Sequence, residues 1–278
     1  MKIEPIKYLK LINEGATLKD KLILFLYFVL NAPINFLRKE KNHKLLGNVK
    51  VSSKDGIFVC GRDMPSAWAG SSFYETDLRK FFDIREGVFL DIGANIGKYS
   101  IILGKNPKIK VIAFEPTPET FKILKKNIEL NKLKNINPIN IALGDKEGVA
   151  DFYLDKEKMW GDLNNSLIAE SLIKKERQIK IMVKVRKLDN VLKDMNLDRI
   201  DLVKIDVEGG ESQVFRGAIK TLKKYHPKII FEAWDKEKLQ EVENIIKPIG
   251  YVINEIASEN YMAIKESKNG GNKNAALF

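Results

Sequence analysis

The chain has 278 residues, enough for one large α/β domain with an appendage. Its 44% hydrophobic and 31% charged residues exclude wholesale disorder and are ordinary for a soluble globular protein. The formal net charge of +11 leaves an anionic partner open, but abundant lysine also serves solubility alone. The single cysteine, Cys60, excludes an internal disulfide and favours a reducing compartment, so we expect a cytoplasmic protein.

Residues 1–48 are predicted to form a helical extension that is both apolar and basic. An unbroken apolar run covers Leu22 to Leu30 and is shorter than the roughly 20 residues of a membrane-spanning helix. Basic residues bracket this run: Lys19, Lys21, Arg38, Lys39 and Lys41. Two interpretations stay open for Leu22 to Leu37. The segment packs against the protein or a second subunit, or it lies on a membrane surface and makes the protein peripheral there.

Residues 49–84 are expected to lead into the main domain. Val49 to Ser52 and Ile57 to Cys60 have the pattern of two short strands, and Lys54-Asp55-Gly56 between them favours a hairpin turn. The apolar spacing of residues 73–82 predicts an amphipathic helix.

Strands and helices alternate through residues 85–265, the expected main domain. The predicted strands are 88–92, 110–114, 136–141, 200–205, 228–231, 251–256 and 261–264. Helices are predicted after most of them, including 118–131, 211–222 and 236–246. This alternation is typical of a doubly wound α/β fold, so we expect a seven-stranded, mostly parallel sheet with helices on both faces.

An insertion at residues 146–187 interrupts the alternation. Residues 149–154 and 179–185 read as strands, and the polar stretch between them contains Asn164, Asn165 and Ser166. Long excursions of this kind are usually functional or mobile, so these side chains either order over a substrate or are merely solvated. Residues 266–278 lack an apolar period and are expected to be a disordered tail.

A glycine-rich turn follows the first strand of the main domain. Asp91 ends the strand, and Gly93, Asn95 and Gly97 follow before a helix begins. Gly93 would let the backbone approach a ligand, and Gly97 would allow close packing of strand and helix. The second strand ends in Glu115-Pro116, where an acidic group can accept hydrogen bonds from a ribose. Together the two turns indicate a nucleoside cofactor, without separating S-adenosylmethionine from NAD.

Five segments in this order resemble the FkbM family of methyltransferases, and the resemblance extends from about Tyr74 to Ile264. The segments are 91–97 (DIGANIG), 113–116 (AFEP), 141–145 (IALGD), 204–211 (KIDVEGGE) and 215–218 (FRGA). Gly210, where the family commonly has Ala, and Trp234, where it often has His, depart from the pattern. The second departure puts in doubt any acid or base borrowed from the family at that position.

The resemblance implies a class I methyltransferase (Rossmann-like) fold and S-adenosyl-L-methionine as cofactor. It assigns Asp91, Gly93 and Gly97 to the methionine part, Glu115 to the ribose and the loop from Leu143 to Asp145 to the adenine. Asn95 and Pro116 stand in the same two turns and belong to the expected cofactor site. Family members typically methylate hydroxyl oxygens, often on sugars or natural products.

Three carboxylates are candidates for the catalytic step. Asp206 ends one predicted strand, Glu208 follows in the loop, and Glu232 ends the next strand, so the three can converge on one pocket. Such a group could take the proton of a hydroxyl acceptor. A Mg²⁺ held by them is compatible with the sequence but not demanded by it, and no zinc spacing is present. Glu211 is better explained as a structural residue of a helix N-terminus, and Glu208 could cap the same helix.

The predicted function is therefore O-methylation of a small hydroxylated acceptor, such as a sugar, a glycan or a lipid-linked sugar precursor. RNA methylation is the alternative that the positive charge suggests, although nucleic acid is the less favoured partner. A membrane-attached, non-catalytic cofactor-binding protein is the third hypothesis. The oligomeric state does not follow from the sequence.

Overall fold

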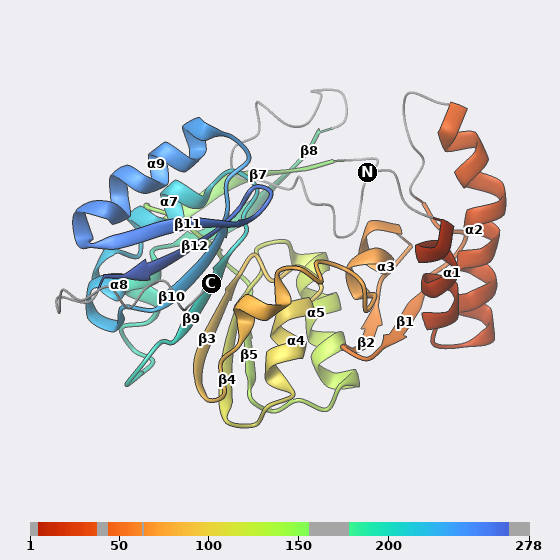
Figure 1. Ribbon diagram of the computed structural model, residues 1–278, viewed down its shortest axis with the longest axis horizontal. Coiled ribbons are helices and arrows are strands. Elements are labelled where there is room, and N and C mark those ends of the chain that lie inside the picture. The colour runs from red at the N-terminus through yellow and green to blue at the C-terminus, as the bar shows by residue number, and fades with distance from the viewer. Residues whose placement is uncertain (1–4, 38–43, 63, 156–177, 267–278) are drawn as a thin grey trace.

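The structure is a computed structural model that describes residues 5–37, 44–62, 64–155 and 178–266. Its centre is a seven-stranded sheet with the strands β3 (Gly87–Ile92), β4 (Ile109–Phe114), β5 (Ile136–Ile139), β9 (Leu202–Ile205), β10 (Lys228–Glu232), β11 (Tyr251–Ala257) and β12 (Asn260–Lys265). Their order is β11-β12-β10-β9-β3-β4-β5, as Figure 1 shows. In this sheet β12 alone runs opposite to the other six strands. The predicted mostly parallel sheet of seven strands is confirmed.

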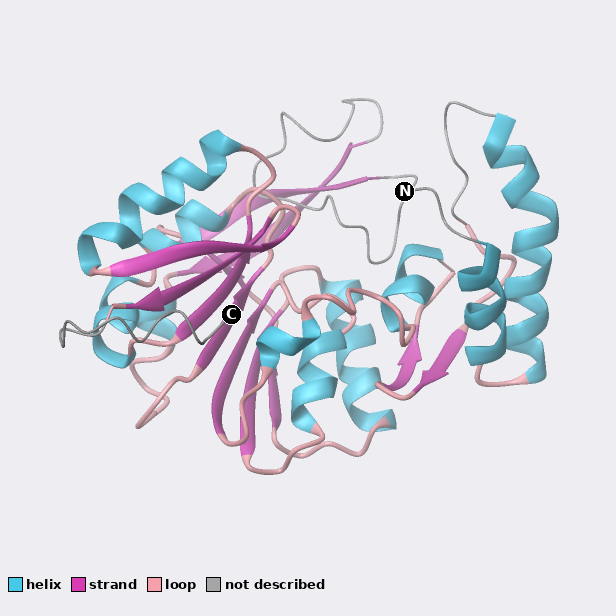
Figure 2. Cartoon of the chain, viewed as in Figure 1, coloured by secondary structure: helices cyan, strands magenta, loops and turns pink. Residues whose placement is uncertain are grey.

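Helices cover both faces of this sheet because its central strands are apolar on both sides. Phe89 and Val111 face a core that includes residues of α4 (Lys98–Gly104) and α5 (Pro118–Leu130). Their chain neighbours Leu90 and Ile112 face a second core with α7 (Glu211–Arg216), α8 (Ile219–Tyr225) and α9 (Lys236–Ile246). Figure 2 shows these two layers of helices on either side of the sheet.

The segments before the main domain are α1 (Pro5–Glu14), α2 (Leu18–Leu37), the hairpin β1 (Lys50–Ser53) and β2 (Gly56–Val59), and α3 (Met64–Gly70). The hairpin lies where the sequence predicts it, and it docks on α5. Asn127 Oδ1 accepts a hydrogen bond from the Val59 N–H at 2.6 Å, and Asn131 Oδ1 accepts one from the Ile57 N–H at 2.9 Å. These bonds join the hairpin to the main domain, and apolar residues of both belong to one hydrophobic core.

The prediction of an amphipathic helix over residues 73–82 is wrong. This segment consists of turns followed by a short 3₁₀ helix, η1 (Arg79–Phe82). Glu75 adopts a left-handed conformation with φ of 46°, which a continuous helix does not allow. The Arg79 guanidinium also donates to the Tyr74 carbonyl at 3.2 Å and forms an ion pair with Asp55 at 2.6 Å. Contacts with the distant hairpin thus decide the shape of this segment.

The inserted strands form a small separate sheet. Its strands are β6 (Ala142–Leu143), β7 (Gly148–Asp155) and β8 (Gln178–Arg186), in the order β6-β8-β7. β7 and β8 pair antiparallel over their full lengths. Asn164, Asn165 and Ser166 lie outside the described residues, and so does the tail beyond residue 266.

The segments 141–145 and 215–218, both part of the family resemblance, pack against each other beside this small sheet. A Cβ on Gly217 would lie 2.0 Å from the Gly144 carbonyl oxygen, so no larger residue fits there. Gly217 also divides the helix predicted over residues 211–222 into α7 and α8. Asp189, in the short helix α6 (Leu188–Val191), accepts hydrogen bonds from the Lys220 and Thr221 N–H groups at the start of α8. These contacts hold α6, α7 and α8 against the segment that contains β6.

Candidate active site

A pocket lies at the carboxyl ends of β3, β4 and β9, where the strand order of the sheet reverses and open α/β sheets bind ligands. It encloses about 1010 Å³ of empty space, including its open mouth. The predicted site residues that line it are Asp91, Gly93, Asn95, Glu115, Pro116, Leu143, Asp206 and Glu208. Gly97, Asp145 and Glu232 do not line it.

The two glycines of the turn after β3 lie close to other segments of the protein. Gly93 has φ of 80°, and a Cβ there would lie 1.8 Å from the carbonyl oxygen of Asp206. Gly97 has φ of 91°, and its Cβ would lie 2.5 Å from Leu124 of α5. The close packing expected at Gly97 is thus present. Gly93 lines the pocket and also makes room for the Asp206 carbonyl, a contact that the sequence did not indicate.

Asp91 is the most enclosed acidic side chain of the pocket, with 1% of its surface exposed. Its Oδ2 accepts hydrogen bonds from the Ser100 N–H at 3.0 Å and hydroxyl at 2.6 Å. Its Oδ1 is buried and has no partner among the described residues. Burial raises the pKa of Asp91, while Lys204 and Ser100 oppose that rise. A buried acceptor of this kind fits a ligand that brings its own donor, such as an ammonium group.

Glu115 is held by the backbone on both of its oxygens. Oε2 accepts the Asn95 N–H at 3.0 Å, and Oε1 accepts the Thr117 N–H at 2.9 Å. Burial raises the pKa of Glu115 to about 7, although these hydrogen bonds act against the rise. Each carboxylate oxygen has a second lone pair, so the side chain can also accept the two hydroxyls of a ribose.

The predicted adenine loop contributes to the pocket in part. Ile141, Ala142 and Leu143 line it, and Phe152 reaches it from the inserted strand β7. Asp145 lies just beyond, and the neighbouring Gly144 bonds through its N–H to the Arg186 carbonyl. The apolar wall therefore comes from residues just before Asp145 and from the insertion, and Phe152 has no sequence signal of its own.

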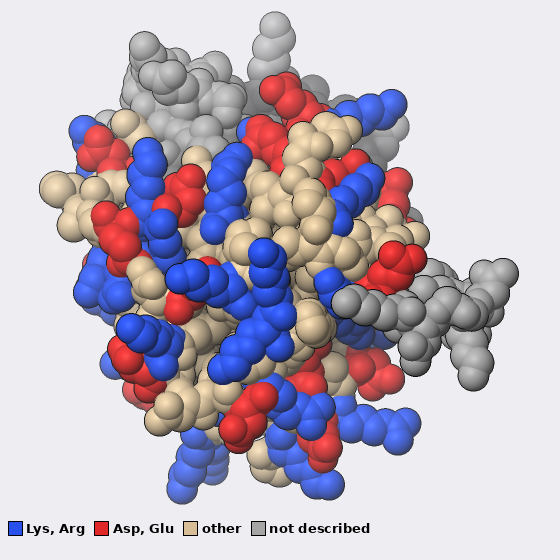
Figure 3. All heavy atoms as spheres, turned by 90° about the vertical axis from the view of Figure 1, so that its left-hand side faces the viewer, with Lys and Arg blue, Asp and Glu red and all other residues tan. Residues whose placement is uncertain are grey.

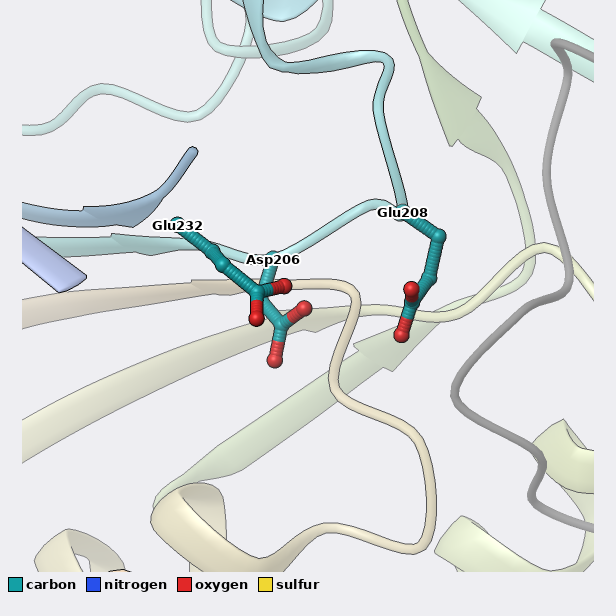
Figure 4. Close-up of side chains that lie close together, drawn as sticks. All are labelled: Asp206, Glu208 and Glu232. Carbon is teal, nitrogen blue, oxygen red and sulfur yellow. The ribbon is translucent and has the colours of Figure 1, made fainter. Parts of the chain in front are cut away.

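The three candidate catalytic carboxylates do converge. One oxygen each of Asp206, Glu208 and Glu232 lies within 4.8 Å of the others, and Figure 4 shows the three carboxyl groups close together. Glu232 faces a smaller hollow, which it shares with Glu75, Lys204 and Asp206. Burial and the negative charge of Asp206 raise the pKa of Glu232 to about 8, while a hydrogen bond from the Trp234 side chain lowers it. Such a set could also hold a divalent cation, which the sequence allows but does not demand.

Lys204 interacts with both Asp206 and Asp91 and was not among the predicted site residues. Its ammonium pairs with Asp206 at 2.7 Å, although its own strand is buried on both faces. Burial lowers the pKa of Lys204, but the carboxylates of Asp206, Asp91 and Glu75 together raise it above its ordinary value. The sequence does contain a signal for it: a lysine within the apolar strand LVKI must be paired with a carboxylate if it is buried.

A second unpredicted group comes from the loop after α3. Tyr74 and Glu75 line the pocket, and the Tyr99 hydroxyl donates to Glu75 Oε2 at 2.7 Å. Burial, followed by the charge of Glu75, raises the pKa of both tyrosines. Because the spacing predicted a helix over residues 73–82, the sequence did not indicate that Tyr74 and Glu75 line the pocket.

The two remaining acidic residues of the β9 loop have separate roles. Glu211 is buried, and its Oε1 accepts the Val207 and Gly209 N–H groups at 3.1 and 3.2 Å, which supports the structural interpretation. The N-cap of α7 is Gly210, which makes no side-chain cap bond. Glu208 has φ of 57° and lines the pocket.

The chain is similar in sequence to known methyltransferases. A family described as "Methyltransferase FkbM domain" matches residues 91–253. The chain is 26% identical to methyltransferase sdnD of Sordaria araneosa, over 59% of the chain and 73% of that protein. It is 30% identical to the 2-O-methyltransferase NoeI of Sinorhizobium fredii, over 55% of the chain and 65% of that protein. It is 26% identical to the hexuronic acid methyltransferase AglP of Haloferax volcanii, over 49% of the chain and 52% of that protein.

Proposed function

Because the chain belongs to the FkbM methyltransferase family, we propose that it transfers the methyl group of S-adenosylmethionine to a hydroxyl oxygen of a sugar, glycan or glycolipid-type acceptor. The observation that carries the proposal is a pocket and an adjoining smaller hollow that together present two sets of carboxylates. Asp91 and Glu115 suit the cofactor, and Asp206, Glu208 and Glu232 stand beside it for the acceptor. A 2-O-methyltransferase and a hexuronic acid methyltransferase among the relatives favour this acceptor class.

The cofactor half of the pocket offers S-adenosylmethionine two carboxylates as hydrogen-bond acceptors and an apolar wall. Asp91 Oδ1, buried and unpartnered in the described part of the chain, would accept from the methionine ammonium. Glu115 would accept from the ribose hydroxyls, and Leu143 and Phe152 would cover the adenine. When bound, the cofactor supplies an electrophilic methyl group on a sulfonium.

The acceptor half supplies the proton acceptor and the alignment. A sugar hydroxyl is a poor nucleophile, and a carboxylate that removes its proton accelerates the step. Glu232 has a pKa of about 8, near the working pH, so it can hold the proton that the hydroxyl loses. Asp206, fixed by Lys204, would accept a hydrogen bond from a neighbouring hydroxyl and hold the acceptor in line for the displacement.

RNA is a weaker candidate acceptor, supported by the net charge of +11 alone. On the face that Figure 3 shows, lysines and arginines alternate with aspartates and glutamates. A continuous basic stripe would favour nucleic acid more strongly than this mixture does.

The direct test is transfer of labelled methyl from S-adenosylmethionine to separate pools of oligosaccharides, glycolipids and total RNA. We expect base-stable label in a carbohydrate-containing pool, with Asp91→Asn as the variant that loses it. Label in RNA alone would replace the proposal with the RNA alternative. Cofactor binding without transfer to any pool would favour a non-catalytic protein.

A further inference from the structure

The outer face of α2 carries a row of exposed large apolar side chains. Leu18, Leu22, Phe25 and Val29 are 84%, 53%, 47% and 45% exposed. Their spacing of four, three and four residues places them on one side of the helix. The opposite side is satisfied by the protein, since Leu24 and Tyr27 are 1% and 3% exposed. We call Leu18, Leu22, Phe25 and Val29 the α2 stripe.

The exposed charged side chains on the described parts of α1 and α2 are all basic. Residues 1–48 contain nine Lys and Arg against four Asp and Glu. Lys10 and Lys19 are exposed on the two helices. The two acidic residues of the described helices are used internally. Asp20 is buried and accepts from the Thr17 and Lys50 N–H groups, and Glu14 accepts from the Ser72 N–H and hydroxyl.

These features together point to an anionic lipid surface as the occupant. An apolar row flanked by lysine, with no exposed carboxylate on the described part of α1 or α2, is complementary to acidic headgroups above acyl chains. A second copy of the chain would bring its own lysines against these, and like charges beside an apolar seam disfavour pairing. None of the described helices is long and apolar enough to cross a bilayer.

We propose that the α2 stripe is a docking surface for the face of an anionic membrane. α2 lies parallel to the bilayer, its apolar side chains enter the headgroup boundary, and the lysines contact acidic lipids. The inference depends on the helical pair alone and is independent of the reaction that the pocket performs.

The test is co-sedimentation of the full chain with vesicles of phosphatidylcholine containing phosphatidylglycerol, compared with pure phosphatidylcholine, at low and high salt. We expect binding to the anionic vesicles that falls as salt rises. The double variant Leu22→Gln/Phe25→Gln should bind at least about tenfold more weakly, because two apolar side chains lose their burial. Lys19→Glu should weaken binding about fivefold.

Matched controls separate this surface from a general effect of exposed residues. Val149 and Met182 are 61% and 72% exposed on the small sheet, so Val149→Gln/Met182→Gln removes equivalent apolar side chains elsewhere. Lys223→Glu makes the same charge change on α8. Both controls should bind as the unchanged protein does. Absence of binding to anionic vesicles overturns the proposal, and so does a dimer in analytical ultracentrifugation that Leu22→Gln/Phe25→Gln dissociates.

Discussion

The site has two halves, one at the ends of β3 and β4 and one at the ends of β9 and β10, and their carboxylates are held by different groups. In the β3–β4 half, Asp91 and Glu115 accept hydrogen bonds from backbone N–H groups, which carry no titratable proton at working pH. In the β9–β10 half, Asp206 pairs with Lys204, and Glu232 faces the negative charge of Asp206. Backbone donors fix an acceptor in place, whereas neighbouring charges couple each group to the protonation of the next.

This difference matches the two tasks of a methyltransferase. Under the proposed function, the first half would bind the cofactor through fixed acceptors. The second half would offer Glu232, whose pKa of about 8 suits a group that takes the proton of an acceptor hydroxyl. Variants of one half should therefore change binding, and variants of the other should change turnover.

The largest expected effect is on turnover in the β9–β10 half. Glu232→Gln keeps the size of the side chain and removes the proton acceptor, so kcat should fall by about 10²–10⁴-fold. Affinity for S-adenosylhomocysteine, measured by calorimetry, should not change. In the unchanged protein kcat should rise with pH through about 8, since the deprotonated Glu232 is the active form. Glu255→Gln, an exposed change on β11, is the control; equal kcat in both variants would remove Glu232 from the mechanism.

The next largest effect concerns the point where the two halves touch. Gly93→Ala places a Cβ against the Asp206 carbonyl at 1.8 Å, in a backbone conformation with φ of 80°, so one loop must shift. We expect the free energy of unfolding to fall by about 3 kcal/mol or more. Gly148→Ala is the matched control, because its φ of 139° is also unusual but no atom lies within 4 Å. Equal losses in denaturant titrations would mean that backbone strain alone matters.

A smaller effect is expected for cofactor binding in the β3–β4 half. Glu115→Ala should weaken S-adenosylhomocysteine binding by about 1.5–3 kcal/mol, the range for hydrogen bonds to a charged group. Glu119→Ala, an exposed carboxylate at the start of α5, should leave the affinity unchanged. NAD should show no measurable binding to the unchanged protein. Unaltered affinity in Glu115→Ala would refute the ribose assignment.

The pH dependence of stability should show a modest effect of the buried Glu211. Burial raises its pKa to about 7 from 4.5, so the folded protein binds this proton more tightly than the unfolded chain does. The stabilisation is therefore complete below about pH 4.5 and is lost as the pH rises through about 7. Glu211→Gln should remove about 1–3 kcal/mol of that dependence in denaturant titrations between pH 5 and 8. An unchanged slope would show that Glu211 is not protonated in the folded state.

The smallest expected effect is from removing metal. Lys204 already balances part of the charge on Asp206, so we expect EDTA to leave kcat unchanged within error. Activity lost with EDTA and restored by Mg²⁺ would assign Asp206, Glu208 and Glu232 to a metal site instead.

The sequence by itself determined the parts of this protein that depend on local patterns. Apolar runs predicted the strands of the sheet, because strands buried on both faces are apolar at every position. The residues after Ile92 and Phe114 predicted the cofactor end, because the carboxyl ends of parallel strands share one edge. The hairpin at residues 50–59 followed from its turn.

The tertiary structure decided what depends on contacts between distant segments. Residues 73–82 have helical spacing, but Asp55 and Arg79 join across the fold and hold them as turns, which brings Glu75 to the pocket. Gly93 is a glycine because the Asp206 carbonyl, more than a hundred residues later in the chain, occupies its Cβ position. Lys204 is tolerated in a buried strand only because Asp206, Asp91 and Glu75 surround it with negative charge. Pairings of this kind are set by packing in three dimensions, which no local pattern records.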